Sequence, residues 1–113
     1  MPRFPGCEKE RDLSKKLRCS EQKMRDFIFE HVYYPDKAWE KEIEGTSVVS
    51  FVVETDGTLS NIKIVRSLEG GIDEEAMLVV ELMNEKGIHW IPVKEKGVAV
   101  PVLFNLPIKF KMD

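Results

Sequence analysis

Apolar and polar residues alternate near the end of the chain in a way that is typical of a β-strand. The apolar members of this stretch all stand at even positions: Val102, Phe104, Leu106, Ile108 and Phe110. Side chains of equal parity project from the same face of a strand, so these residues form one continuous apolar face. The pattern therefore predicts a strand from Val98 to Phe110 whose even face packs against the core.

Two prolines remove hydrogen-bond donors from this predicted strand. Pro101 and Pro107 have equal parity, and N–H groups of equal parity point to the same side of a strand, so both missing donors fall on one side. Proline is tolerated in a sheet where its nitrogen faces no partner, which predicts an edge strand. Such an edge either needs protection or pairs with an extended peptide, and the pattern alone favours protection.

An antiparallel hairpin is predicted earlier in the chain. Residues 46–54 and 58–66 are both rich in β-branched and apolar side chains with a period of two. Between them, the pair Asp56-Gly57 has the composition of a tight turn with two residues at positive φ.

Three helices are predicted from apolar positions spaced three to four residues apart. The first runs from an N-cap at Ser20 to about Val32. A short helix follows Pro35, and a third runs from an N-cap at Asp73 to about Asn84. The side chains expected to be buried are Met24, Phe27, Ile28 and Val32 in the first helix, Ala38, Trp39 and Ile43 in the second, and Ala76, Val79, Val80 and Met83 in the third.

These elements indicate an α+β domain. A three-stranded antiparallel sheet with two main helices packed on one face is the simplest arrangement that buries every apolar stripe. We expect this domain to occupy residues 20–113, after an irregular segment over 1–19 that contains two prolines. Residues 89–97, between the third helix and the last strand, are expected to form a loop.

Composition narrows the class of protein. The chain has 113 residues, of which 42% are hydrophobic and 33% charged, and its net charge is -3. It is long enough for one domain and too apolar for disorder. It lacks the concentrated basic surface that nucleic acids and anionic membranes require. No run approaches the roughly 20 apolar residues of a membrane span, and no signal peptide is visible, so we expect a cytosolic protein or a piece of a longer one.

The two cysteines, Cys7 and Cys19, lie in a polar, charged segment. Cysteines that flank a short loop suit a disulfide, which requires an oxidising compartment and contributes on the order of 3 kcal/mol. Two free thiols in a reducing compartment fit the composition equally well. Both states stay open at this level.

No catalytic or metal-binding group is predicted. The histidines, His31 and His89, are far in sequence from each other and from the cysteines, whereas structural zinc sites use close pairs of ligands. The acidic cluster at 73–75 is explained by its favourable interaction with a helix start. An enzyme that uses Cys7 or a histidine is the weakest hypothesis, and no cofactor is expected.

Tyr33 and Tyr34 follow the first predicted helix. Two adjacent tyrosines cannot both face the core, so we expect one to be packed and the other to lie at the rim. Tyrosine is also frequent in protein interfaces, which makes the pair a candidate contact with a partner.

The run from Tyr34 to Ser67, YPDKAWEKEIEGTSVVSFVVETDGTLSNIKIVRS, resembles the C-terminal domain of TonB. The resemblance is carried by a Tyr-Pro pair, an alanine three residues on, a glycine before a Val/Phe strand, Asp-Gly at the turn, and a returning strand. Their joint spacing is specific, although no single motif is.

Segments outside this run agree with the same family. DEEAMLVVELM (73–83) is similar to its second helix, and LPIKF (106–110) is similar to its last strand. The tryptophan, proline and glycine between them are similar to its Trp-Pro-Gly loop. FPGC (4–7) is similar to the opening FPGG of the Bacteroidetes-type branch.

The resemblance implies a periplasmic, non-enzymatic domain that is tethered to the inner membrane in its full-length protein. It implies that the edge of the last strand pairs with an extended segment of an outer-membrane receptor and couples the proton-motive force to transport. Carried onto this sequence, the peptide-binding residues are Tyr33, Tyr34, Val98, Ala99, Val100, Val102, Leu103, Phe104 and Asn105. An oxidising periplasm also implies a disulfide between Cys7 and Cys19.

A second hypothesis keeps the fold and changes the role. The family is also fused to membrane-bound sensors and peptidases, where such a domain regulates or assembles. In that role its edge strand pairs with a second copy, giving a homodimer, or with another envelope protein.

Overall fold

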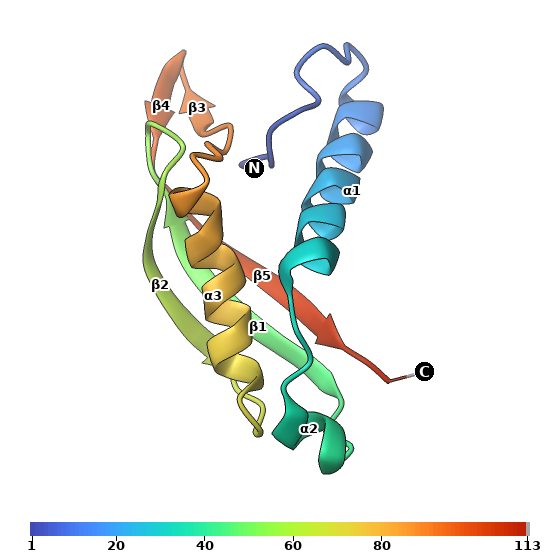
Figure 1. The fold of residues 1–113 in the computed structure, drawn as a ribbon. Helices are drawn as coiled ribbons and strands as arrows, with labels where there is room; N and C mark the ends of the chain where they lie inside the picture. Colours follow the sequence, from blue (N-terminus) through green and yellow to red (C-terminus); the bar gives the residue numbers. More distant parts are fainter. Residues whose placement is uncertain (113) are drawn as a thin grey trace.

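A computed structural model describes residues 1–112 of the chain. Within these residues the helices and strands follow one another as Figure 1 shows. They are α1 (Leu13–His31), α2 (Asp36–Glu40), β1 (Gly45–Val53), β2 (Leu59–Arg66), α3 (Ile72–Glu85), β3 (Val93–Glu95), β4 (Val98–Val100) and β5 (Val102–Phe110). The predicted fold class is confirmed, because a three-stranded antiparallel sheet carries helices on one face.

The main sheet has the strand order β2-β1-β5. β1 pairs with β5 without a break, from Gly45 opposite Phe110 to Val53 opposite Val102. The β1–β2 pairing contains two register shifts, and Asn61 of β2 stands at a φ of 48°. β5 is therefore the regular edge strand that the prolines predict, and its outer side has no strand partner among residues 1–112.

The predicted β1–β2 hairpin is confirmed, but its turn differs in detail. The Glu54 N–H donates to the Thr58 carbonyl at 2.8 Å and closes a three-residue loop. Only Gly57 takes a positive φ, 86°, whereas Asp56 was expected to do so as well. The Asp56 carboxylate instead accepts hydrogen bonds from the hydroxyl and the N–H of Thr58, at 2.7 and 3.0 Å, which lower its pKa. A Cβ at Gly57 would lie 2.3 Å from the Trp90 carbonyl oxygen, so glycine is required for space as well as for φ.

α1 begins well before the predicted N-cap at Ser20, so the expected irregular segment ends earlier than residue 19. The Asp12 carboxylate caps the helix by accepting the Lys15 N–H at 3.0 Å, and Ser20 is buried within it. Leu13, the first helical residue, is 65% exposed. The first turns bury little apolar surface, so apolar spacing alone did not reveal them.

α3 starts two residues earlier than expected, after an N-cap at Gly71, and Asp73 lies in its first turn without capping it. The Asp73 carboxylate accepts hydrogen bonds from the Ser47 hydroxyl at 3.1 Å, from the Leu68 N–H at 3.0 Å and from the Ser67 hydroxyl. Asp73 therefore ties the start of α3 to β1 and to the connection after β2, which is a different role from the predicted cap.

The predicted strand from Val98 to Phe110 is wrong in its first part. Pro101 separates β4 from β5, and β4 turns back to pair with β3 in a second, two-stranded sheet. Lys96 and Gly97, both at positive φ, connect these strands as a tight hairpin. The predicted loop over 89–97 thus contains β3. β1 ends opposite Val102, so Pro101 has no residue of β1 to pair with and the chain turns there.

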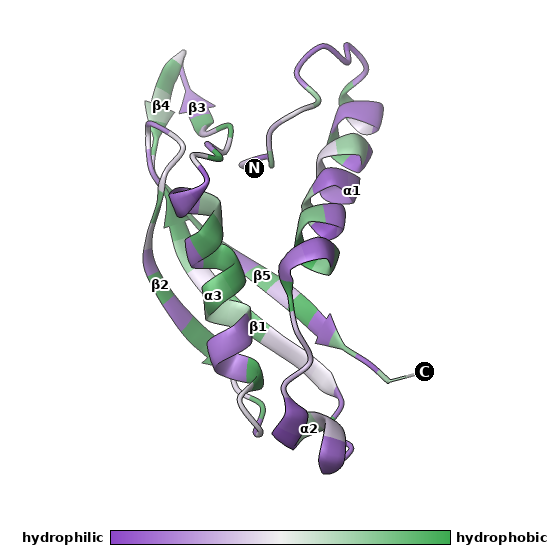
Figure 2. Cartoon of the chain, viewed as in Figure 1, coloured by the Kyte–Doolittle hydropathy of each residue, from purple (hydrophilic) through white to green (hydrophobic). Residues whose placement is uncertain are grey.

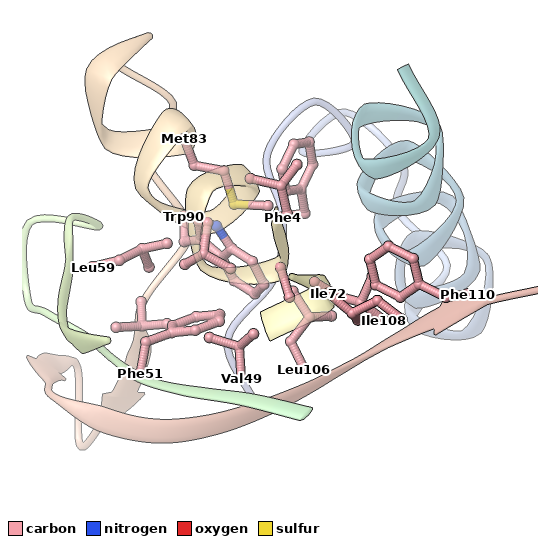
Figure 3. Close-up of a cluster of buried hydrophobic side chains, with 14 of the residues drawn as sticks. Phe4, Val49, Phe51, Leu59, Ile72, Met83, Trp90, Leu106, Ile108 and Phe110 are labelled. Atoms are coloured by element: carbon pink, nitrogen blue, oxygen red, sulfur yellow. The ribbon is translucent and has the colours of Figure 1, made fainter. Parts of the chain in front are cut away.

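The hydrophobic core lies between the main sheet and α3 and centres on Trp90 (Figure 3). The Trp90 ring meets Phe51 of β1 at 5.4 Å and Phe104 of β5 at 5.3 Å between ring centroids. The buried residues that were predicted correctly are Ala38, Ala76, Val79, Val80, Met83, Leu106, Ile108 and Phe110. Val49, Phe51 and Val53 of β1 are buried as well. Met24, Phe27, Ile28, Val32 and Ile43, also expected to be buried, are only partly buried. Trp39 was expected to be buried, but it is 55% exposed beside the ring of Tyr34.

The N-terminal segment packs into one end of this core. Arg3 and Ile91 exchange two backbone hydrogen bonds, of 3.1 and 2.8 Å. The neighbouring ring, Phe4, lies 5.8 Å from Trp90 and 5.8 Å from Phe27 of α1, so it fills the space between the core and the helix. We refer to Arg3, Phe4 and the disulfide described next as the N-terminal clamp.

A disulfide joins Cys7 to Cys19, with 6.0 Å between their Cα atoms, as the family resemblance implies. It links the N-terminal segment to the first half of α1 covalently. Within α1 only Ser20 is fully buried, while Met24, Phe27, Ile28 and Val32 pack against the core in a partly buried state, so the clamp adds to the packing that holds the helix. Figure 1 shows α1 standing apart from α3.

Replacing Phe4 with alanine is expected to destabilise the domain by about 3 kcal/mol, because it removes a buried ring and leaves a cavity. Phe29→Ala serves as the matched control, because the Phe29 side chain is 86% exposed and its loss should change stability by less than about 0.5 kcal/mol. Urea unfolding under non-reducing conditions measures both. Equal stabilities for the two variants would show that Phe4 does not anchor α1.

Candidate functional site

The outer side of β5 presents backbone groups that no strand uses. The ladder with β1 continues through Pro107, which lies opposite Val48. A proline in an uninterrupted ladder has its nitrogen on the unpaired side, so the odd residues of β5 point their N–H and C=O groups away from β1. The outward donors are therefore Leu103, Asn105 and Lys109.

The two faces of β5 differ in the same regular way. Its even side chains lie on the helix-covered face, where Leu106, Ile108 and Phe110 are all at most 3% exposed. Its odd side chains are exposed on the opposite face of the sheet, which no helix covers within residues 1–112. The alternation along β5 is visible in Figure 2.

A groove runs between α1 and the outer side of β5. Its volume is about 400 Å³, and its lining on α1 includes Ile28, Phe29 and Val32. Its lining on β5 is the segment from Pro107 to Lys109. We call this hollow the α1–β5 groove. If another strand paired with the outer side of β5, the side chains of that strand that face α1 would point toward the groove.

The rim of the α1–β5 groove is polar. The Gln22 amide donates to the Asp26 carboxylate at 2.8 Å, and Arg25 forms an ion pair with Glu21 at 3.4 Å. These polar groups are therefore already partnered along α1 itself, in the i, i+4 arrangement that a helix favours. The remaining α1 lining, Ile28, Phe29 and Val32, is apolar.

The predicted peptide-binding residues fall into two groups. Val102, Leu103, Phe104 and Asn105 belong to β5, as predicted. Val98, Ala99 and Val100 instead form β4, beyond Pro101 and in the second sheet, so they do not extend the β5 edge. The side chain of Phe104 packs against Phe51 and Trp90, and its backbone groups face β1, so Phe104 offers no hydrogen-bonding group to the open edge.

The two tyrosines divide as expected, with one packed and one exposed. Tyr33 is 76% exposed, and its N–H donates to Glu75 at 3.1 Å. The ring of Tyr34 lies 5.7 Å from Phe110 at the end of β5, and its hydroxyl donates to the Ile43 carbonyl. Burial, and to a lesser extent the nearby carboxylate of Glu44, raise the pKa of Tyr34. Tyr34 thus holds α2 against the end of β5.

Other candidate groups take part in local structure. His31 stacks on Phe27, with 4.3 Å between ring centroids, and His89 contacts the Asp56 carbonyl at 3.0 Å. Residues 1–112 contain no group of three or more side chains suited to hold a metal ion. Within the same residues, no helix combines the length and the apolar character needed to cross a membrane.

The sequence analysis missed Phe29 and the later part of β5 as site residues. Phe29 stands outside the apolar stripe of α1, and this off-stripe aromatic was the one signal that could have revealed it. In the structure the Phe29 side chain is 86% exposed on α1, and it gains its significance from its place in the lining of the α1–β5 groove. Pro107, Ile108 and Lys109 were predicted only as part of the last strand, and nothing in the sequence marks them as the lining of a groove.

The geometry is that of a small α+β protein-interaction domain with an open strand edge. The sequence profile of the family described as "Gram-negative bacterial TonB protein C-terminal" matches residues 30–112, which is well over half of the chain. The chain therefore belongs to the TonB C-terminal domain family. No protein of curated function matches it in sequence.

Two solved structures are similar in fold. Both are NMR solution structures of the C-terminal domain of TonB from Helicobacter pylori, a longer and a shorter piece. The longer one matches with a TM-score of 0.62 and 24% identity over 82% of this chain and 80% of that chain. The shorter one matches with a TM-score of 0.60 and 24% identity over 80% and 91%.

Membership of this family bears on several predictions. Its domains are periplasmic and non-enzymatic and bind other proteins, which confirms that the chain is not an enzyme. The family implies a role in TonB-like energy transduction, in contact with outer-membrane receptors. An oxidising periplasm also agrees with the Cys7–Cys19 disulfide.

Hydrogen exchange should reveal the alternation of the β5 backbone. The N–H groups of Phe104, Leu106 and Ile108 face β1 and should exchange roughly a hundredfold more slowly than those of Asn105 and Lys109. Exchange measured by NMR on the free domain tests this. Slow exchange at the odd residues and fast exchange at the even ones would place the open donors on the other parity.

The raised pKa of Tyr34 makes stability depend on alkaline pH. A phenol whose pKa is higher in the folded chain than in the unfolded one stabilises the fold below about pH 10, and this contribution is lost as the pH rises through the folded-state pKa. Urea midpoints from about pH 8 to 11 should therefore fall more steeply in the wild type than in Tyr34→Phe. Tyr33→Phe is the control and should keep the wild-type slope; equal slopes in all three proteins would contradict the prediction.

Proposed function

We propose that the domain binds an extended segment of an outer-membrane receptor by adding it as a fourth strand to β5. The observation that carries the proposal is the open, regular edge of β5, whose outward N–H and C=O groups lack a strand partner within residues 1–112. Backbone pairing supplies affinity for any extended segment, and the side chains beside the edge select among them.

The other edge of the sheet is a poorer candidate. β2 contains a residue at positive φ, Asn61, and its ladder with β1 shifts register twice. Such irregularities twist an edge and interrupt its row of donors, which is a common protection against strand addition. β5 has no register shift along its full length.

The proposed binding edge differs from the one expected from the sequence. It begins at Val102 and extends to Phe110, so Leu103, Asn105 and Lys109 contribute the donors. Pro101 lies at its beginning and removes no hydrogen bond from it. Val98, Ala99 and Val100, with Tyr33 and Tyr34 at the other end, are proposed as flanking contacts.

The proposal includes a cellular role. Pairing with a receptor segment would transmit energy from the proton-motive force to transport, with the domain tethered to the inner membrane through another part of its protein. The similarity of residues 4–7 to the opening of the Bacteroidetes-type branch supports assignment to that branch.

NMR titration of the oxidised domain with peptides from the N-terminal segments of outer-membrane receptors tests the proposal. We expect shifts concentrated at Leu103, Asn105 and Lys109 and slowed exchange of their amides. Asn105→Pro should weaken binding roughly tenfold because it removes one outward donor. Asn105→Ala is the matched control, since it removes the same side chain and keeps the N–H.

Two results would overturn strand addition at β5. One is a set of shifts confined to other elements, and the second is equal affinity of Asn105→Pro and Asn105→Ala. Sedimentation at increasing concentration separates receptor binding from the self-pairing alternative, because a domain that dimerises through β5 should sediment faster at high concentration and lose this behaviour in Asn105→Pro.

A further inference from the structure

We propose that α1, held by the N-terminal clamp, forms the second wall of the binding site and selects extended segments with apolar side chains at alternate positions. This inference rests on the proposed strand addition and names the chemistry of the partner. The occupant is an extended segment of another envelope protein whose α1-facing side chains are apolar.

The alternation follows from strand geometry. In an antiparallel pair, directly opposite residues project to the same face of the sheet. Partner residues opposite Leu106 and Ile108 would therefore point to the side on which α1 lies. There they meet the α1–β5 groove, whose α1 lining includes Ile28, Phe29 and Val32.

The chemistry of the groove favours apolar side chains over charged ones. On α1, Asp26 is hydrogen-bonded to Gln22, and Arg25 is paired with Glu21, so these groups have partners without a ligand. Phe29 has the largest exposed fraction of any large hydrophobic side chain in residues 1–112, 86%, and it lines the groove. Covering this ring with an apolar side chain removes apolar surface from water, which a polar side chain achieves less well.

The clamp explains why the groove stays open. The apolar packing of α1 is limited, because Met24, Phe27, Ile28 and Val32 are only partly buried against the core. Phe4 and the Cys7–Cys19 disulfide attach the helix to the end of the core as well. A wall that is fixed in advance costs less ordering on binding than a helix that must be immobilised by the partner.

A strand attached to the domain tests the inference without a known receptor. An Asn-Gly turn placed directly after Lys111 fixes the register of a following strand that is close to β5 in length. In this register Lys111 and the first probe residue form a hydrogen-bonded pair. This agrees with the geometry of β5, because the odd residues point their N–H and C=O groups outward. The two probes use an even length of eight residues and alternate valine and threonine in opposite phase, so that both have the same composition.

The first probe places its valines opposite Leu106, Ile108 and Phe110, toward α1, and the second places its threonines there. We expect the Asn105 and Lys109 amides to be protected from hydrogen exchange roughly tenfold more in the first fusion, because its valines cover the groove. Phe29→Ala should reduce this difference to less than about threefold. Leu13→Ala, which removes another exposed apolar side chain of α1 outside the groove, should leave it unchanged.

The outcomes separate the two proposals. Equal protection by both probes, or a phase difference that Phe29→Ala leaves intact, overturns the role of α1 while strand addition at β5 stands. Protection by neither probe overturns strand addition and the inference together. A phase difference lost in Leu13→Ala as strongly as in Phe29→Ala shows a general destabilisation of α1 and contradicts selection by the groove.

Discussion

The packing of Trp90 is the contact on which the arrangement of the domain depends. The residue is 2% exposed, and its ring touches Phe4, Phe51 and Phe104, which come from the N-terminal segment, β1 and β5. The backbone N–H of Trp90 also donates to the Gly57 carbonyl at 2.9 Å, which joins the residue to the β1–β2 turn. Through its ring and its backbone together, Trp90 connects the sheet, the hairpin and the segment that carries α1, and the absence of a side chain at Gly57 is a condition for the backbone contact.

Elements that depend on local patterns were predictable from the sequence. The even apolar face of β5, the β1–β2 hairpin and the buried stripe of α3 all follow from periodicity, because each places its apolar residues on one side of a regular element. The edge position of β5 followed from proline, although only Pro107 of the two prolines used for that prediction lies in the strand. The backbone part of the candidate site, which is the open edge of β5, was therefore predictable, whereas the side chains of α1 beside it were not.

What could not be predicted depends on contacts between distant residues. The carboxylate of Asp73 was interpreted as a helix cap, but it bonds to Ser47, which lies on another element. β5 begins only after Pro101, because β1 ends opposite Val102. The end of β1 lies far away in the sequence, so the pattern over residues 98–110 does not reveal this boundary. The placement of α1 depends on a phenylalanine and a cysteine in a segment without periodicity, so the groove beside β5 was invisible to sequence analysis.

The clamp lies outside the part of the chain that the family profile matches. The family match starts at residue 30, so it includes the sheet, α2 and α3 and leaves out the clamp and nearly all of α1. The matched part accounts for the strand edge, and the unmatched part accounts for the wall beside it. The proposed site thus combines a strand edge inside the matched residues with a helix that lies mostly outside them.

The disulfide also has a mechanical consequence. Tension applied upstream of Cys7 crosses the sulfur–sulfur bond directly into α1 at Cys19, so the loop of chain between the two cysteines carries no load. Before the load reaches this bond, it must separate Arg3 from Ile91 and pull Phe4 out of its place beside Trp90. The contacts of Arg3 and Phe4 are therefore the first to yield under a pull on the N-terminus, and the disulfide behind them limits how much of the helix can unravel.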